Sequence, residues 1–450
     1  MSAVDGKGAS TGSAPARLPS LTGLRAFAAL LVFLTHILWY TTLIQGETGD
    51  DLRDKFTLSG SYGVGFFFIL SGFVLTWTAR SDDTAPSFWR RRLAKIGPMH
   101  VVTFALAAIL VVSTDRPTRT VDWIAAATMQ QAWFPSVETS AAVNGVAWSL
   151  CCEFFFYLMF PALLPLLRRI RDEWLWPALG VVVLLIAGAF LIGTYVVSDQ
   201  PRLLAFSVSG ELSFKQVWFV YFFPPVRALE FVLGILLARV VAAGRWPRIS
   251  LVPAFVLAVA GYVIALYEPY LAGSAGLATI WTAPLIAAAA TADRRQTASV
   301  FRNRTVVFLG EISFAFYMVH WITIVTTAEL LGTRTFSLGV GTLMSLGVLV
   351  AAGVIATVLY LCVERPLVRR FGRHRPGGAG VPLIHQPAPP VEAGSARGGR
   401  SPVRSPDRRR RLITRRPPSS SPRPRSHRPP PARRGTGRGR RPPCAAWPSG

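Results

Sequence analysis

Cysteine is scarce in this chain, with four among 450 residues. Cys151 and Cys152 are adjacent in an apolar run, Cys362 ends another such run, and Cys444 lies near the C-terminus. The sequence contains no CxxC pair and no His/Cys spacing typical of a metal site. It therefore predicts neither a disulfide framework nor a bound metal.

Charged residues are also few. They make up 16% of the chain against 51% hydrophobic residues, and the mean hydropathy is +0.39. At about 150 residues per domain, this length would suggest three soluble domains. So little charge argues against that division and predicts a chain that is mostly membrane-embedded.

Acidic residues are the rarest charged class, with 23 Asp and Glu against 48 Lys and Arg, a net charge of +25. Residues 373–450 carry +17 of this charge and 17 of the 34 prolines. Such a composition cannot offset the entropy of ordering, so we predict a disordered basic tail at 373–450 and a disordered N-terminus at 1–17. The tail lacks interleaved aromatic residues, so no specific nucleic-acid partner is expected.

Ten apolar runs of membrane-spanning length follow one another along the chain, which predicts an all-α polytopic membrane protein. The predicted spans are 24–44, 60–79, 98–114, 146–167, 174–197, 217–238, 249–267, 272–290, 305–331 and 336–363.

The short loops between these runs differ strongly in charge. With ten spans, 22 Lys and Arg fall on one side of the membrane and seven on the other. Because positive loops are retained in the cytosol, both termini are predicted to be cytosolic in a multi-pass protein of the plasma membrane.

Several ionisable residues lie inside the apolar runs, where charge is costly and usually functional. Arg25 and His36 are eleven residues apart in the first run, which places both on one helix face. Counting about 1.5 Å per residue in a core of about 30 Å, His36, His320 and Glu153 lie about 18, 22 and 20 Å from the cytosolic side. Two imidazoles and a carboxylate at one depth favour a proton-handling site. For each residue alone, a structural hydrogen bond between helices is the alternative.

Two further groups of charges have simpler explanations. Arg227 and Glu230 are spaced i,i+3 after Pro224 and Pro225, which predicts a self-neutralising pair beside a broken helix. The run at 88–98 holds four cations, which mark a cytosolic loop and also suit a polyphosphate ligand.

Six motifs, taken in chain order, resemble the membrane-bound acyltransferase-3 family of bacterial multi-span O-acyltransferases. They are LPSLTGLRAFAALLVFLTH (18–36), GVGFFFILSGFVLTW (63–77), FWRRRLAKIGP (88–98), NGVAWSLCCEFFFYLMFP (144–161), GEISFAFYMVHW (310–321) and VERP (363–366). The third departs from the family pattern, with Lys95 in place of an arginine and Gly97 in place of an aromatic residue. The resemblance predicts a transmembrane acyltransferase domain at 18–372.

This resemblance implies transfer of an acyl group, usually acetyl, from cytosolic acyl-CoA to a hydroxyl of a sugar, surface glycan or secondary metabolite such as a macrolide. The acyl-CoA is a co-substrate, and no metal is implied. The phosphates of CoA would be held by Arg90, Arg91, Arg92 and Lys95. The substrate cavity would be lined by Trp148, Ser149, Tyr157, Tyr317 and His320.

For the chemistry we hypothesise that His36 is the general base for the acceptor hydroxyl. Glu153 would orient the acceptor or fix the imidazole tautomer, and Arg25 would stabilise developing negative charge or hold the donor. A transient acyl group on His36 is an alternative mechanism that the sequence leaves open.

A transporter of a polar or proton-coupled solute is the alternative function, since it would also place histidine and glutamate near the midplane. It predicts two related halves with matching broken helices, whereas adjacent prolines occur in the sixth predicted span alone.

Overall fold

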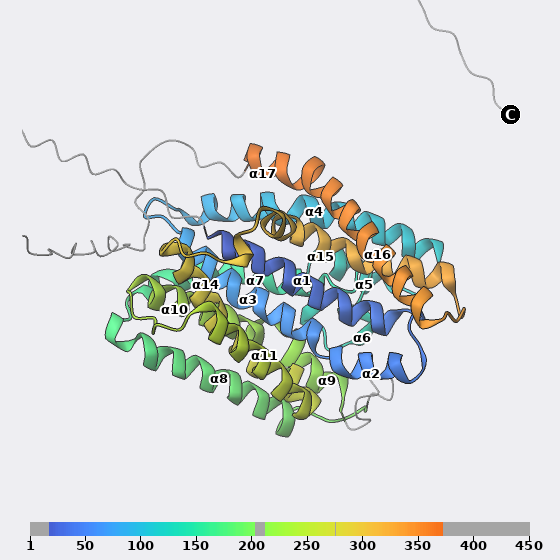
Figure 1. Ribbon diagram of the computed structural model, residues 1–450, viewed down its shortest axis with the longest axis horizontal. Coiled ribbons are helices and arrows are strands. Elements are labelled where there is room, and N and C mark those ends of the chain that lie inside the picture. Colours follow the sequence, from blue (N-terminus) through green and yellow to red (C-terminus); the bar gives the residue numbers. More distant parts are fainter. Residues whose placement is uncertain (1–17, 203–211, 275, 372–450) are drawn as a thin grey trace, which may run out of the picture. The chain divides into compact units, whose positions relative to one another are not determined.

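The computed structural model describes residues 18–202, 212–274 and 276–371, and within them the chain is helical without a named strand (Figure 1). The all-α prediction is therefore confirmed. The two segments predicted to be disordered, 1–17 and 373–450, lie outside the described residues.

Seven helices are long and apolar enough to cross a membrane, which makes this a multi-pass membrane protein. They are α1 (Pro19–Tyr40), α3 (Ser59–Thr78), α4 (Ala85–Ser113), α7 (Trp148–Arg168), α8 (Leu175–Tyr195), α15 (Arg304–Leu331) and α16 (Leu338–Leu359). Each coincides with a predicted span, and α4 begins 13 residues earlier than predicted because the arginine-rich run at 88–98 is helical.

The other three predicted spans are also helical, but their helices are too short or too charged to count as membrane-spanning by length and composition. α10 (Pro224–Ala242) carries three charged residues, and α11 (Leu251–Tyr267) has only 17 residues. The third is an interrupted run of α12 (Tyr270–Ser274), α13 (Gly276–Thr279), η4 (Ile280–Thr282) and α14 (Ala283–Arg294). The exact count of ten spans thus stays a prediction.

Short elements connect the spans. They are α2 (Gly46–Phe56), α5 (Thr120–Ala127), η1 (Gln131–Trp133), α6 (Val137–Ser140), η2 (Asp172–Trp174), α9 (Phe214–Val217), η3 (Trp218–Phe222), η5 (Val300–Arg302), η6 (Tyr360–Glu364) and α17 (Arg365–Phe371). The predicted break at the prolines is confirmed, because π-helical η3 ends at Phe222, Phe223 has extended backbone and α10 begins at Pro224. Proline suits that first helical position, where its missing N–H removes no hydrogen bond.

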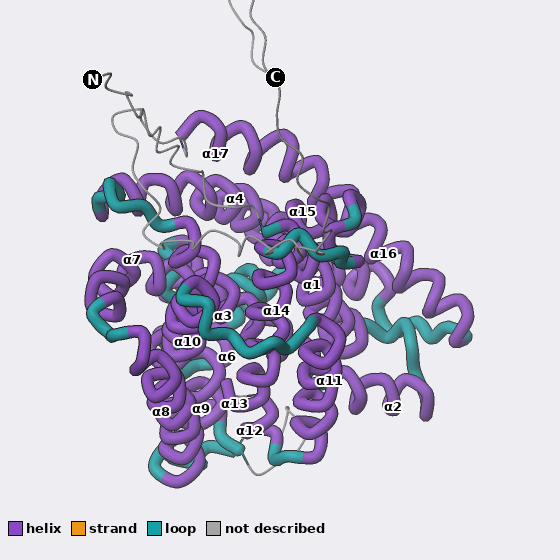
Figure 2. The backbone as a smooth tube through the Cα atoms, turned by 60° about the vertical axis from the view of Figure 1, so that its left-hand side comes forward, coloured by secondary structure: helices purple, strands orange, loops and turns teal. Residues whose placement is uncertain are grey.

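Close helix crossings hold the central helices together. α1 packs against both α3 and α15, and α3 packs against α10 (Figure 2). At the α3–α10 crossing, a methyl group on Gly234 would lie 1.9 Å from the carbonyl oxygen of Ile69, and one on Gly72 would lie 2.0 Å from that of Phe231. Only glycine permits backbones to approach this closely, a common device between membrane helices.

The outward faces of the peripheral helices are apolar. Leu184 of α8, Val252 of α11 and Leu343 of α16 each expose about 70% of their surface. Exposed aliphatic faces of this kind are stable against lipid and unstable against water, so these helices suit the lipid-facing layer.

Candidate active site

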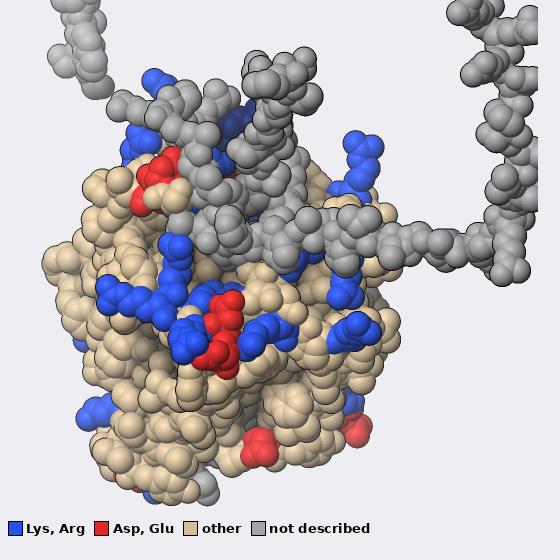
Figure 3. All heavy atoms as spheres, turned by 90° about the vertical axis from the view of Figure 1, so that its left-hand side faces the viewer, with Lys and Arg blue, Asp and Glu red and all other residues tan. Residues whose placement is uncertain are grey.

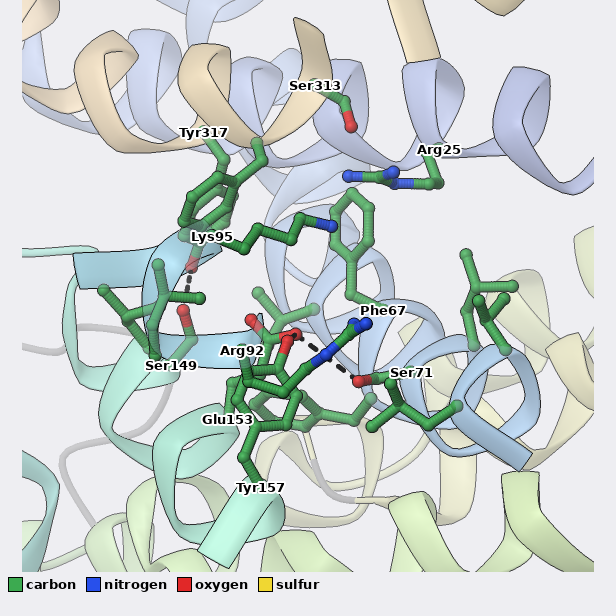
Figure 4. A pocket seen from close by; sticks show the side chains of 18 of the residues that line it. Arg25, Phe67, Ser71, Arg92, Lys95, Ser149, Glu153, Tyr157, Ser313 and Tyr317 are labelled. Carbon is green, nitrogen blue, oxygen red and sulfur yellow. Dashed lines mark hydrogen bonds between the residues drawn. The ribbon is translucent and has the colours of Figure 1, made fainter. Parts of the chain in front are cut away.

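A cavity of about 130 Å³ lies among α1, α3, α4, α7 and α15. Half of its lining is apolar. The polar part consists of Arg25, Ser71, Arg92, Lys95, Ser149, Glu153, Tyr157, Ser313 and Tyr317 (Figure 4). Five distant segments of the chain thus contribute polar groups to one cavity.

Glu153 is the carboxylate of this cavity. It accepts a hydrogen bond from the hydroxyl of Tyr157, one turn later in α7, and a longer one of 3.4 Å from Ser71 of α3. The i,i+4 spacing of Glu153 and Tyr157 on a helix makes the first contact local. The second contact ties α7 to α3 at the level of the cavity.

Three cations face this carboxylate. The side chains of Arg25, Arg92 and Lys95 point into the cavity (Figure 4). Arg92 and Lys95 share one face of α4 at i,i+3, and the Arg92 guanidinium lies over the rings of Phe88 and Tyr157, at 5.6 and 5.9 Å from their centroids. The site therefore combines one carboxylate with an excess of positive charge.

The helical form of α4 divides the arginine run. Arg90 is exposed and does not line the cavity. Arg91 forms an ion pair of 2.6 Å with Asp83 and lines a neighbouring surface hollow, called the rim hollow below. The rim hollow, of about 190 Å³, includes Arg80, Asp83, Arg91 and Arg92 in its lining. Because Arg92 lines both the cavity and the rim hollow, it lies between them.

The two histidines meet beside the cavity. Nδ1 of His36 in α1 lies 3.0 Å from Nε2 of His320 in α15, so these two helices bring the rings into contact. The His36 ring also packs edge-on against Trp321, with centroids 5.2 Å apart. His320 is fully buried, and His36 is half-buried.

Tyr317 connects the histidines to the cavity, whose lining includes neither imidazole. Its hydroxyl lies in the cavity lining and 2.7 Å from the hydroxyl of Ser149, while its carbonyl oxygen is 2.7 Å from Nδ1 of His320. The described structure shows no hydrogen bond between Glu153 and either imidazole. His320 is the hydrogen-bond partner of His36 Nδ1, so the alternative in which Glu153 fixes the imidazole tautomer by direct contact has no support in this geometry.

The remaining predicted cavity residue, Trp148, lies elsewhere. Its ring packs against Tyr221 and Phe222, with centroids 4.7 and 4.6 Å apart, and it is not part of the cavity lining. It thereby joins α7 to η3.

Two serines of the cavity were missed by sequence reasoning. Ser71 contacts Glu153, and the buried hydroxyl of Ser313 has no protein partner. Ser313, Tyr317 and His320 are spaced i, i+4 and i+7, so the helical period offered a signal for Ser313. No such signal existed for Ser71, which stands among glycine and apolar residues.

A third missed residue anchors the helix that carries Arg25 and His36. Leu18, the residue before α1, makes no side-chain cap, and Asp293 of α14 takes that role. Its carboxylate accepts from the backbone N–H of Ser20 at 2.8 Å and from the Ser20 hydroxyl at 2.7 Å. An acidic group at a helix N-terminus satisfies free N–H groups and complements the helix dipole.

We expect Asp293→Ala to destabilise the protein by about 1–3 kcal/mol, because it leaves buried donors of Ser20 without an acceptor. The measurement is thermal unfolding in detergent. Asp172→Ala is the matched control, since Asp172 pairs with Arg239 but is 60% exposed, and such pairs contribute about 0–1 kcal/mol. Equal shifts in the two variants would contradict the capping role.

In the part of the chain that the structure describes, no group of three His, Cys, Asp or Glu side chains is arranged to hold a metal ion. The three cations of the cavity, Arg25, Arg92 and Lys95, are suited to hold an anionic group.

Comparison with known proteins agrees with the motif resemblance. Residues 18–363 match the family model described as an acyltransferase domain. The chain is 38% identical over 372 residues to acyltransferase MdmB of Streptomyces mycarofaciens, covering 80% of this chain and 94% of that protein. It is 24% identical over 347 residues to O-acetyltransferase OatA of Staphylococcus aureus, covering 69% of this chain and about half, 51%, of OatA. No solved structure is detectably similar.

Proposed function

We propose, from the premise that this chain belongs to the acyltransferase-3 family, that it moves an acyl group such as acetyl from cytosolic acyl-CoA to a hydroxyl of a sugar, surface glycan or secondary metabolite. The family establishes an acyltransferase. The donor, the side of the membrane from which it enters and the class of acceptor are the proposal.

The main support for acyl-CoA as the donor is the positive charge of the cavity. Arg92 joins the rim hollow, where Arg91 lies, to the cavity that holds Arg25 and Lys95. The phosphates of CoA would lie at the rim and the pantetheine arm would follow the cavity toward Tyr317. Guanidinium groups bind phosphate oxygens in pairs, and Lys95 contributes a single point charge.

The side of entry is supported by the distribution of charge. The face at the ends of α3, α7 and α10 carries many Lys and Arg side chains (Figure 3). Exposed arginines stand at or just after the C-terminal ends of α7, α10 and α14, namely Arg168, Arg169, Arg245, Arg248 and Arg295. By the positive-inside bias this face is cytosolic, and the rim hollow opens on it.

In the proposed reaction, Nε2 of His36 takes the proton of the acceptor hydroxyl while its oxygen attacks the thioester carbon. A new C–O ester bond forms, the C–S bond breaks, and the departing CoA sulfur receives the proton from the imidazolium. Arg25 stabilises the negative charge that develops on the carbonyl oxygen or holds the donor, and Glu153 orients the acceptor. Transient acylation of His36 is the alternative route.

The direct test supplies purified protein with radiolabelled acetyl-CoA and, separately, a macrolide with free sugar hydroxyls and a surface polysaccharide. Release of CoA that depends on an acceptor, with label in that acceptor, is the expected result. Uptake of solute into vesicles without consumption of acetyl-CoA would replace the proposal with a transporter.

The division of the arginine run gives a sharper prediction. Arg92→Ala is expected to raise the KM for acetyl-CoA by about 10- to 100-fold, since a hydrogen bond to a charged group contributes about 1.5–3 kcal/mol. Arg90→Ala, two residues away on the exposed face, is the matched control and should change KM by less than about threefold. Equal effects would place the phosphates on the outside of α4 instead of at the cavity rim.

A further inference from the structure

The hydrogen bonds of His320 determine where the protons of the histidine pair lie. Nδ1 of His320 is 2.7 Å from the backbone carbonyl oxygen of Tyr317 and 3.3 Å from that of Phe316. A carbonyl oxygen only accepts, so Nδ1 of His320 must carry a hydrogen.

The other ring nitrogen of His320 is then the free one. His320 is completely buried, and its ring stacks on Phe316 with an interplanar angle of 12° and a centroid distance of 5.7 Å. An apolar enclosure disfavours imidazolium, so the ring is neutral and Nε2 bears a lone pair. That lone pair lies 3.0 Å from Nδ1 of His36.

The proton assignment of His36 follows. A lone pair on His320 requires a donor opposite it, so Nδ1 of His36 carries its hydrogen and Nε2 of His36 is bare. A bare Nε2 is the nitrogen that a general base needs. The hydrogen-bond chain runs from the Tyr317 carbonyl through His320 to His36. As in a catalytic triad, one group fixes the tautomer of the histidine that acts as base, but here that group is a neutral histidine instead of a carboxylate.

We propose that His320 is a positioning residue that holds His36 in the tautomer with Nδ1 protonated and Nε2 free to take the acceptor proton. This rests on the proposed role of His36 as the base. When Nε2 of His36 accepts that proton, the Nδ1–H bond to His320 becomes charge-assisted and stabilises the imidazolium. The partner is uncharged, so the resting pair requires no buried ion.

The surroundings of the pair support this division of roles. The rings packed against it are Phe33, Tyr40, Phe316, Tyr317 and Trp321, of which the two tyrosines alone are titratable. The backbone carbonyl of Val32 lies one helical turn before His36 and could also accept a hydrogen from the His36 ring. Because a hydrogen-bond distance to the His36 ring is shown, among the described residues, for His320 alone, the experiment has to separate the effect of His320 on the His36 tautomer from that of the Val32 carbonyl.

The first measurement is solid-state NMR of the full chain, labelled with ¹⁵N-histidine and reconstituted in bilayers, with His36→Gln used to assign the His36 signals. A protonated Nδ1 and bare Nε2 on His36 are expected in the wild-type protein. A hydrogen on Nε2 of His36 would overturn the proposal without any variant. In His320→Leu, the Nδ1 signal of His36 should lose its hydrogen. Retention of the Nδ1 hydrogen there would assign the tautomer to Val32 and also overturn it.

The second measurement compares turnover of acetyl-CoA in His320→Leu and His320→Gln. Leucine has no acceptor, and kcat should fall by about 10²- to 10⁴-fold with KM for acetyl-CoA unchanged within about threefold. Glutamine offers an amide oxygen to Nδ1–H and should stay within about tenfold of the wild-type kcat. Equal losses in the two variants, or no loss in either, would reduce His320 to a packing residue.

These outcomes are distinguishable from failure of the proposed function itself. If wild-type protein consumes no acetyl-CoA with any acceptor, the acyltransferase assignment of the donor fails, while the NMR signals still report the tautomer. If turnover is normal and the tautomer is the opposite one, the positioning role alone fails.

Discussion

His36→Ala is expected to lower acceptor-dependent release of CoA by about 10²- to 10⁴-fold, the usual contribution of a general base, or further if His36 carries the acyl group. The ring is half-buried and faces Trp321, Tyr40 and His320. Its loss would therefore remove the proposed base and the proposed Nδ1–H donor to His320 Nε2. The measurement is the initial rate with radiolabelled acetyl-CoA at saturating acceptor.

The matched control for this variant is His100→Gln. His100 is a buried histidine of α4 whose Nε2 lies 3.2 Å from the carbonyl oxygen of Ala127, and it lines neither hollow of the site. Its replacement should change stability and leave the rate within about threefold, because it touches no reacting group. A His36→Ala protein that folds and acylates at the wild-type rate would remove His36 from the chemistry.

Arg227→Met is expected to produce the largest loss of stability, about 3–5 kcal/mol, because it strands the Glu230 carboxylate in the protein interior. Both side chains are 1% exposed, and Arg227 Nη2 lies 3.0 Å from Glu230 Oε2. Glu230 also accepts a hydrogen bond from Thr279. The Arg227 guanidinium lies 5.1 Å from the centroid of the Phe68 ring.

A double-mutant cycle with Glu230→Gln tests the cause. The neutral amide still offers an oxygen to Thr279, so the double variant should be more stable than Arg227→Met alone. Thermal and denaturant unfolding in detergent supply the four free energies. Arg116→Met is the control, since the Arg116–Glu329 pair is 40% and 43% exposed and should contribute about 0–1 kcal/mol. A loss below about 1 kcal/mol in Arg227→Met would show that Glu230 is not a stranded charge.

Local contacts were predictable because helical geometry determines them. The i,i+3 spacing of Arg227 and Glu230 predicted their ion pair, which the structure confirms. The adjacent prolines predicted the break between η3 and α10. Hydropathy placed the long helices, since burying twenty apolar residues outweighs every other preference in the membrane.

The depth of each ionisable residue in the membrane was predictable as well. Which neighbouring helix its side chain faces was not. The rise per residue put His36 and His320 at similar levels, and they meet. The same reasoning put Glu153 there too, yet it faces the neighbouring cavity with Tyr157 and Ser71. The arginine run gave four equivalent cations, of which Arg92 and Lys95 turn inward and Arg90 turns out.

By itself, the sequence determined the helical class, the membrane setting, the family and the axial level of the ionisable groups. Tertiary structure alone decided which of those groups share a cavity, that His320 rather than Glu153 adjoins His36, and that Asp293 caps α1 from 273 residues away. The reason is physical. Period and hydropathy describe one helix at a time. The rotation of each helix is set by close crossings such as that of α3 and α10, where Gly72 meets Phe231 and Gly234 meets Ile69, residues far apart in the chain.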